Sequence, residues 1–358
     1  MVYMLNISSM LAPILTWCEV GFFSVMMIHA HRPDSLKRGI IVPIPKGNKD
    51  HNDPNNYRGI TLMCTLSKLY DKLLLNRHES WILSQLNVLQ GISQKSASSL
   101  HTTLLLREAI AQQSITYVAL LDVKKAFDTV WVKGLLYKLH CMGMNKLLRA
   151  TIYDSYDNFK CTVSIAGGIS NWFSPKQGIH QGDVLSMYLF CLYNNDLVSE
   201  LVEIPCGVRI NNQCVPAPSF VDDISVVAKS IVSMQHYLDT AYAHSLKWKY
   251  TFNTDKIKII VFGVKNKKLY FTIKGKQLSV VDGYKHLGVP LCSSKSAEVK
   301  FIEEKVNNLK VACNMIIDLL EVVRVVLLLL VHPRCIGQFL DYCMDVKCGQ
   351  YVNVICLF

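Results

Sequence analysis

Short apolar runs alternate along the chain with longer stretches in which apolar residues recur every three or four positions. The short runs are rich in β-favouring residues and predict strands at 40–45, 57–62, 117–121, 161–165 and 257–262. The longer stretches have helical spacing and predict helices at 99–112, 134–140, 186–201 and 233–247. The pattern therefore predicts a chain in which strands and helices are interspersed.

Local features refine three of these elements. Pro43 and Pro45 are expected to keep the strand at 40–45 at a sheet edge, because proline cannot donate a ladder hydrogen bond. Gly167–Gly168 is expected to form the turn of a hairpin that begins with the strand at 161–165. Ser67 is expected to cap a further helix, whose apolar residues are Leu69, Leu73, Leu74 and Trp81.

The two ends of the chain are less regular. The first thirty residues are apolar but lack an early basic region, and Pro13 and Glu19 interrupt them, so a packed helix is favoured over a signal peptide or a membrane span. The apolar run at 325–331 is too short to cross a bilayer. A helical pattern begins at Lys295 and loses its periodicity after Pro333.

The amino-acid composition limits the kinds of binding partner and the cellular compartment that suit this chain. Hydrophobic residues make up 51% of the 358 residues, which excludes a disordered chain. The excess of 38 lysines and arginines over 27 acidic residues gives a net charge of +11, which suits nucleic acid or an anionic membrane surface. The 13 cysteines include no Cys-x-x-Cys pair, so a reducing compartment is favoured over a disulfide framework.

Paired carboxylates stand out within the apolar run Phe220–Val227. Asp222 and Asp223 interrupt it as a strand-turn-strand pattern would require, and Asp122 ends the buried strand at 117–121. Aspartates are also common turn residues and helix caps, so each alone has an ordinary explanation. Together they match what phosphoryl transfer with two divalent ions needs, which is carboxylates from separate strands converging on one place.

Two basic residues in the first half of the chain could meet a triphosphate. Lys46 follows the strand at 40–45, and Arg58 lies on the strand at 57–62. A cationic hairpin of this kind would suit phosphate oxygens. The alternative is that both are solvated surface charges.

The ordered set of motifs resembles the reverse transcriptase domain of non-LTR (LINE-type) retrotransposons over residues 33–291. The fingers motifs are PIPKG at 43–47 and NYRGITL at 56–62, and the others are LDVKKAFD at 121–128 (motif A), QGIHQGDVLS at 177–186 (motif B), FVDD at 220–223 (motif C), FNTDK at 252–256 (motif D) and HLGV at 286–289 (motif E). The chain departs from the family pattern in the finger loop at 90–99, where Ile92, Ser93 and Ser96 replace the usual residues.

The resemblance implies a role for each matching residue. Asp122 and Asp222 would hold two Mg²⁺ ions, for which Mn²⁺ would be able to substitute, and Asp223 would be a third, auxiliary carboxylate. Residues that would contact or surround the incoming dNTP are Lys46, Arg58, Phe127, Gln181 and Gly182. The Phe127 ring would block a ribose 2′-OH, unless it is ordinary core packing, and Lys256 would protonate the pyrophosphate, unless it is merely an exposed strand-end lysine.

The resemblance also implies a fold and a function. The fold is an α+β right-hand polymerase with an apolar N-terminal segment (1–31), fingers (32–115), a palm (116–291) whose antiparallel sheet is backed by helices, and a thumb remnant (292–358) that is degenerate after about 333. The implied enzyme is an intracellular RNA-directed DNA polymerase, in the nucleus or the cytoplasm, that takes an RNA template, a DNA primer and dNTPs. No membrane or stable protein partner is expected.

Two other readings stay open at the level of sequence. One is a catalytically silent, nucleic-acid-binding remnant, which the altered finger loop and the irregular C-terminal part favour. The other is a different right-hand enzyme, such as a group II intron maturase or a viral RNA polymerase. Phe127 argues against an RNA polymerase, which should not block a 2′-OH.

Overall fold

The computed structural model describes residues 20–294, apart from 48–49, 94–97, 166, 206, 211–212 and 265–268, together with 296–300, 303, 307 and 310. The chain divides into two units, Met1–Ser294 and Lys295–Phe358, and the first is described below. Most of the expected thumb remnant and residues 1–19 of the N-terminal segment lie outside the described residues. Residues 20–29 are helical, as expected for the end of that segment.

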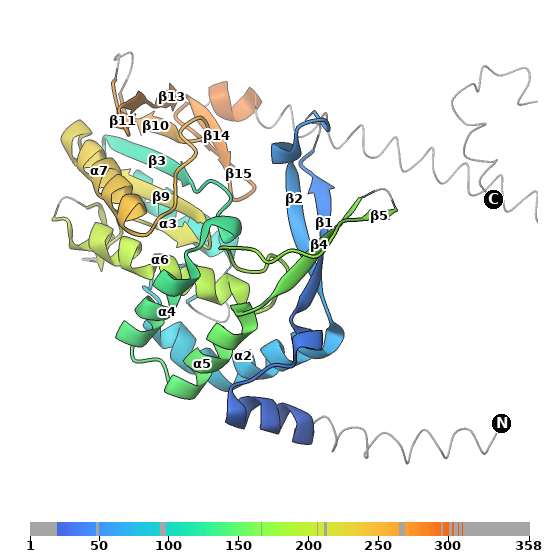
Figure 1. The fold of residues 1–358 in the computed structure, drawn as a ribbon. Coiled ribbons are helices and arrows are strands. Elements are labelled where there is room, and N and C mark those ends of the chain that lie inside the picture. The colour runs from blue at the N-terminus through green and yellow to red at the C-terminus, as the bar shows by residue number, and fades with distance from the viewer. Residues whose placement is uncertain are drawn as a thin grey trace, which may run out of the picture. The chain divides into compact units, whose positions relative to one another are not determined.

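A five-stranded sheet in the order β13-β10-β3-β9-β8 forms the centre of the first unit (Figure 1). The strand β3 (Thr116–Asp122) pairs antiparallel with β9 (Asp223–Ala228) on one side and with β10 (Lys258–Phe262) on the other. At the edges, β8 (Ser219–Phe220) is antiparallel to β9, and β13 (Ser279–Val281) is parallel to β10. The expectation of an antiparallel sheet is therefore confirmed for its four strands β10, β3, β9 and β8.

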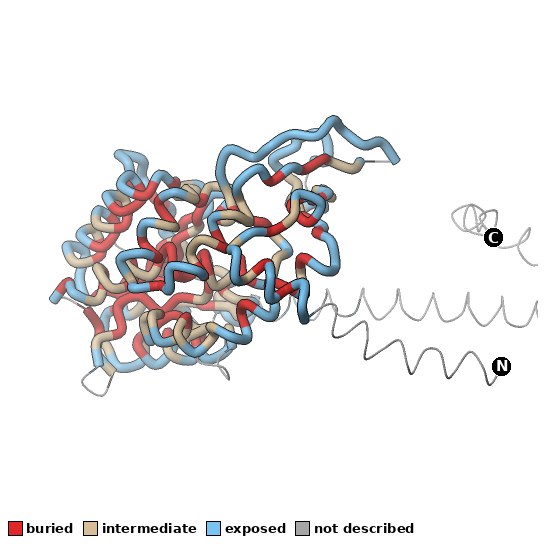
Figure 2. Tube along the Cα trace, turned by 60° about the horizontal axis from the view of Figure 1, so that its bottom comes forward, coloured by how far each residue is buried: buried red, intermediate tan, exposed pale blue. Residues whose placement is uncertain are grey.

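Helices cover both faces of this sheet. On one face, α3 (Ser99–Ala111) packs Leu106 and Ala109 against Val118 and Leu120 of β3. On the other face, α6 (Ser186–Glu203) and α7 (Ile231–Lys247) form a larger core with the alternate strand residues. Figure 2 shows buried segments running through the interior of this lobe and exposed turns around it. The sheet is thus a rigid platform, whose strand ends can present side chains.

A second sheet has the strand order β2-β1-β4-β5. Its members are β1 (Arg38–Pro45), β2 (Tyr57–Met63), β4 (Lys160–Ile165) and β5 (Gly168–Ile169). The strand β1 is not an edge strand throughout, because β4 pairs with it at Arg38–Ile41. The edge prediction for 40–45 was therefore wrong at Ile40 and Ile41. Pro43 and Pro45 fall where β1 has only β2 as a neighbour, so their missing N–H groups leave no ladder bond unmade.

Because β4 lies in the range expected for the palm and β1 in the range expected for the fingers, one sheet combines both ranges, and the boundary at 115/116 stays a prediction. The remaining helices of the unit are α2 (Thr65–Gln85), α4 (Val132–Cys141) and α5 (Lys146–Tyr156). Short elements complete it: 3₁₀ turns Asp34–Leu36, Pro54–Asn56 and Phe127–Thr129, and strands β6 (Arg209–Ile210), β7 (Gln213–Cys214), β11 (Thr272–Ile273), β12 (Lys276–Gln277), β14 (Gly283–His286) and β15 (Val289–Cys292).

The prediction for the start of α2 was wrong. The cap position is Cys64, and Ser67 is buried inside the helix, where its hydroxyl accepts a hydrogen bond from Arg32 and donates one to the Leu36 carbonyl. The buried face of α2 carries Tyr70, Leu74, Leu75 and Ile82, whereas Leu69 and Leu73 are exposed. None of the described helices combines the length and apolar character needed to cross a membrane. The six cysteines in the described part are all free.

Candidate active site

The central sheet brings the three aspartates together. Asp122 is the last residue of β3 and lies directly opposite Asp223, the first residue of β9. Opposed residues of an antiparallel pair share a face, so both side chains leave the sheet on the same side. Asp222 occupies the turn between β8 and β9, close enough for the charge of Asp122 to act on its carboxyl group. Residues separated by about 100 positions in sequence therefore form one acidic cluster.

Two carboxyl groups of this cluster, those of Asp222 and Asp223, hold their protons more tightly than isolated aspartates. Burial raises the pKa of Asp222, and the negative charge of Asp122 adds to the rise against the opposing effects of the Asp222 backbone N–H and of Arg58. Although Asp223 as a whole is exposed, partial desolvation of its carboxyl group, with the charges of Asp222 and Asp122, raises its pKa to about 6. A divalent cation would relieve this repulsion, and oxygen ligands of this kind suit Mg²⁺. The residues present therefore fit a metal site.

Replacing Asp223 with asparagine should stabilise the metal-free fold at neutral pH. A carboxyl whose pKa is raised on folding costs stability once it ionises, so the gain should grow between about pH 4 and pH 6 and then stay constant. Because the residue is exposed and screened, we expect a gain of less than about 1 kcal/mol. Urea unfolding of Asp223→Asn and wild type in EDTA across this pH range measures it. A variant less stable than wild type at pH 7 would contradict the conclusion that burial and the neighbouring carboxylates disfavour the ionised form of Asp223.

The motif D segment lies alongside motif A. The Asn253 N–H donates to the Asp122 carbonyl at 2.8 Å, and the Lys124 N–H donates to the Thr251 carbonyl at 2.9 Å. This pairing places the half-exposed Lys256 ammonium 3.2 Å and 3.3 Å from the two carboxylate oxygens of Asp122. Lys256 thus lies beside the acidic cluster, and its ammonium balances part of the charge of Asp122.

The hairpin of β1 and β2 carries both expected cations, Lys46 and Arg58. Arg58 lies opposite Ile44 in the hairpin, and its charge acts on Asp222. Lys46 follows β1, and its ammonium donates to the Asn55 carbonyl at 3.0 Å. Partial desolvation raises the pKa of Asp128, and Lys125 and Lys46 oppose that rise. Arg58 therefore acts on the acidic cluster itself, whereas Lys46 acts on Asp128 of motif A.

The expected nucleotide-contacting residues of motifs A and B meet at one junction. Phe127 is half-buried and its ring stacks on Phe190, with 5.3 Å between centroids, and its carbonyl accepts from the Ile179 N–H at 2.9 Å. The Gln181 carbonyl accepts from the Thr61 N–H of β2 at 2.8 Å. Gly182 has a φ of +115°, and a Cβ there would lie 3.0 Å from the Thr61 carbonyl, so only glycine fits without strain.

Next to this junction lies a cleft of about 800 Å³ between the second sheet and helices α4 and α5. Its walls include part of motif B, from Gln177 to Gln181, and five aromatic rings, those of Trp131, Tyr153, Tyr156, Phe159 and Phe173. His180, which lies in motif B, is packed between the rings of Tyr156 and Phe159, and burial lowers its pKa to about 3. Packing is therefore its role in this structure.

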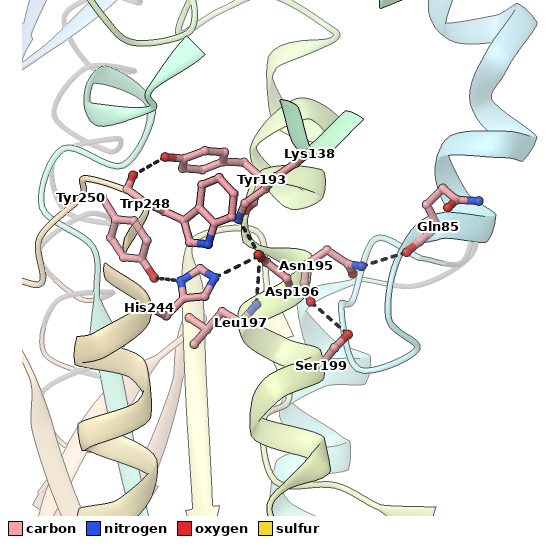
Figure 3. A network of polar contacts seen from close by, with 10 residues as sticks. All are labelled: Gln85, Lys138, Tyr193, Asn195, Asp196, Leu197, Ser199, His244, Trp248 and Tyr250. Atoms are coloured by element: carbon pink, nitrogen blue, oxygen red, sulfur yellow. Dashed lines mark hydrogen bonds and ion pairs between the residues drawn. The ribbon is translucent and has the colours of Figure 1, made fainter. Parts of the chain in front are cut away.

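A separate polar network joins the helices α4, α6 and α7 (Figure 3). Among the described residues, Asp196, Glu200 and His244 have the spacing of a metal-binding group. The Lys138 ammonium already lies 2.6 Å from an Asp196 oxygen and 3.7 Å from the centre of the Trp248 ring, and His244 bonds the same Asp196 oxygen at 3.0 Å. Since a cation occupies this position, the network is a structural link between α4, α6 and α7. It is distinct from the acidic cluster at Asp122.

A model of the family described as reverse transcriptase (RNA-dependent DNA polymerase) matches residues 44–301. The chain belongs to the reverse transcriptase family. The RNA-directed DNA polymerase from the mobile element jockey of Drosophila funebris is 27% identical over 301 residues, covering 77% of this chain and 31% of that protein. The Pol polyprotein from the type-1 retrotransposable element R2 of Nasonia vitripennis is 25% identical over 307 residues, covering 79% of this chain and 29% of that protein.

These relatives confirm the resemblance to non-LTR retrotransposon reverse transcriptases. The chain spans about a third of the length of the curated relatives that it matches. Among solved structures, apo telomerase from Candida tropicalis, truncated from its C-terminal domain, has a TM-score of 0.52 at 13% identity, covering 73% of this chain and 54% of that chain. This likeness confirms the α+β right-hand polymerase fold.

Proposed function

We propose that this chain is the polymerase domain of an RNA-directed DNA polymerase of a non-LTR retrotransposon. The observation that carries the proposal is the register of β3 and β9, which sets Asp122 opposite Asp223 with Asp222 in the adjoining turn. The reaction is attack of a primer 3′-OH on the α-phosphate of a dNTP. Such chemistry needs positioning and charge stabilisation, and no covalent protein intermediate.

The family generally uses divalent metal ions, and we assign Asp122 and Asp222 as the residues that would hold Mg²⁺, with Asp223 as the auxiliary carboxylate. Bound divalent ions supply electrostatic stabilisation to the attacking and leaving oxygens. The raised pKa values of Asp222 and Asp223 support this assignment, because they report carboxyl groups that are partly desolvated and that lie close to one another's negative charge. Mn²⁺, which accepts the same oxygen ligands, is expected to substitute.

The surrounding residues would bind and orient the nucleotide. Arg58 and Lys46 would contact the triphosphate, whose oxygens suit guanidinium and ammonium donors. Gln181 and Gly182 would lie along the new base pair, with glycine permitting close approach of the backbone. Lys256, already within reach of Asp122, would donate a proton to the departing pyrophosphate.

The proposed partners are an RNA template, a DNA primer and dNTPs. The net charge of +11 favours binding to polyanions, and the jockey relative is named as an RNA-directed DNA polymerase. An intracellular location, in the nucleus or the cytoplasm, stays a prediction, for which the free cysteines of the described part are the supporting observation.

The test is extension of a DNA primer on an RNA template by the purified protein. With dNTPs and Mg²⁺ or Mn²⁺, the expected product is DNA complementary to the template, and EDTA should abolish it. No extension with either metal, under conditions where the protein is folded and binds the primed template, would support the silent remnant instead. Extension that ignores the template sequence would contradict the proposal as stated.

Replacing Phe127 with alanine should admit ribonucleotides. The ring would otherwise occupy the space of a 2′-OH, so its loss should raise the ratio of rNTP to dNTP incorporation by about tenfold to a hundredfold. Steady-state kinetics with each nucleotide on the same primed template measures the ratio. Phe127 also stacks on Phe190, so Phe190→Leu serves as a control that loosens the same contact without opening the gate. An unchanged ratio in Phe127→Ala would show that the ring only packs.

A further inference from the structure

The residue before the metal-binding turn has an unusual backbone. Val221 has a φ of +56°, in the left-handed region that a β-branched residue rarely adopts. It stands directly before Asp222, so its backbone sets the direction in which that carboxylate leaves the turn. A conformation of this kind persists only where surrounding groups hold it. The contacts of Val221 therefore bear on the geometry of the site.

The Gln90 side chain holds both backbone polar groups of Val221. Its Oε1 accepts from the Val221 N–H at 2.8 Å, and its Nε2 donates to the Val221 carbonyl at a longer 3.4 Å. Gln90 is only 3% exposed, so water does not compete for these bonds. The Gln90 side chain, 131 positions earlier in sequence and in the finger loop, thus holds Val221 in its left-handed conformation.

The loop around Gln90 is itself docked on the same hairpin. The Gly91 N–H donates to the Ser219 carbonyl at 2.7 Å, and the Ser219 N–H donates to the Leu89 carbonyl at 2.9 Å. A Cβ on Gly91 would lie 2.7 Å from the Phe220 ring and 2.4 Å from the Thr102 hydroxyl. No larger residue fits there without displacing the hairpin or α3, so the glycine permits this close approach.

A second set of bonds ties this loop to the helix α6. The Asn195 side chain accepts from the Asn87 N–H at 2.7 Å. It also donates to the Gln85 carbonyl at 2.9 Å, the bond that Figure 3 shows. The Asn87 side chain in turn accepts from the Leu89 N–H at 3.0 Å. Because α6 is packed in the core, the Gln90 side chain is held by a fixed support and not by a free loop.

We infer that Gln90 is a positioning residue, which fixes the left-handed turn at Val221 and thereby aims the Asp222 carboxylate at the bound cation. For its effect on catalysis the inference rests on the proposed function, but its effect on cation binding does not. Where the sequence suggested only a loop that departs from the family pattern, the structure assigns its first two residues, Gln90 and Gly91, to support of the catalytic hairpin.

The test measures Mn²⁺ binding by electron paramagnetic resonance, alongside primer extension. Gln90→Met keeps the size of the side chain and removes both hydrogen bonds, and it should weaken Mn²⁺ binding by about tenfold. It should lower kcat for primer extension by about tenfold or more, with a smaller change in the KM for dNTP, because the nucleotide contacts are left in place. The exposed Gln112→Met is the matched control and should change neither value.

Relief of the strain supplies the decisive comparison. Val221→Gly accepts a positive φ without cost, so Gln90→Met in that background should change Mn²⁺ binding by less than about threefold. The same loss with and without Val221→Gly would overturn the inference, because Gln90 would then act by another route. Wild-type Mn²⁺ binding in Gln90→Met would overturn it as well.

Two further results distinguish a failure of this inference from a failure of the proposed function or of folding. If wild type binds Mn²⁺ but extends no primer, the proposed function fails and the coupling of Gln90 to Val221 is still read from Mn²⁺ binding. If circular dichroism shows that Gln90→Met does not fold, Gln90→Asn takes its place, since it adds no charge and its shorter side chain cannot reach both backbone groups of Val221 as Gln90 does. Its expected loss of Mn²⁺ affinity, measured against the same Val221→Gly background, is smaller but also suppressed by the glycine.

Discussion

Asp222→Asn is expected to lower the rate of primer extension by about a thousandfold or more, which corresponds to about 4 kcal/mol of lost transition-state stabilisation. Asparagine keeps the size of the side chain but cannot supply the negative charge that a divalent cation needs. Because burial raises the pKa of the Asp222 carboxyl, its ionised form costs the metal-free fold stability. The variant should therefore fold at least as well as wild type, and the loss should be one of function.

The matched control is Asp128→Asn. Asp128 lies in motif A, six residues after Asp122, and is an exposed residue of the 3₁₀ turn Phe127–Thr129. We expect it to keep extension within about threefold of wild type, since the Asp128 carboxyl lies outside the acidic cluster and would hold no metal ion. Single-turnover incorporation by both variants measures the contrast. Equal losses in the two would mean that general charge, and not the cluster, carries the effect.

Arg32→Met is expected to have the largest effect on stability, at about 3–5 kcal/mol. Arg32 is 2% exposed, and its guanidinium donates to Asp71 at 2.5 Å and 3.1 Å and to the Ser67 hydroxyl at 2.7 Å. Its removal would leave the Asp71 carboxylate buried without a partner. The carboxylate of Asp183 in motif B would also lose a favourable charge, since Arg32 opposes the burial that raises the Asp183 pKa to about 7.

Chemical denaturation measures the free energy of unfolding of Arg32→Met, with the exposed Arg38→Met as control. Removing both partners, as in Arg32→Met with Asp71→Leu, should recover much of the loss, because no buried charge then remains unpaired. A loss below about 1 kcal/mol in the single variant would mean that the pair is open to water. That result would contradict the burial described here.

The acidic cluster could be predicted from sequence because each of its parts has a local signal. A buried apolar run ends at Asp122, and a second apolar run is broken by Asp222 and Asp223, so acids at the ends of two apolar strands are enough to suggest convergence. The order of motifs A to E then indicates how the strands are related. The β3–β9 register confirms this part directly.

Other features could not be read from sequence because they depend on distant partners. The edge prediction for the strand at 40–45 failed at Ile40 and Ile41, since no local pattern reveals that β4, more than 100 residues later, pairs there. Serine is a residue type that often caps helices, yet Ser67 lies inside α2, where its hydroxyl accepts a hydrogen bond from the distant Arg32. Gln90 gives no signal at all, because a buried amide that holds a backbone turn looks like any polar loop residue until the fold is known.

The most direct test of the central claim is the single-turnover rate at which one dNTP is added opposite a defined RNA base as Mg²⁺ is titrated. Wild type should add only the complementary nucleotide, with a rate that saturates in Mg²⁺, and Asp122→Asn should stay at background over the same range. Equal, Mg²⁺-independent rates for wild type and Asp122→Asn, or addition that ignores the template base, would contradict the assignment of RNA-templated synthesis to this acidic cluster.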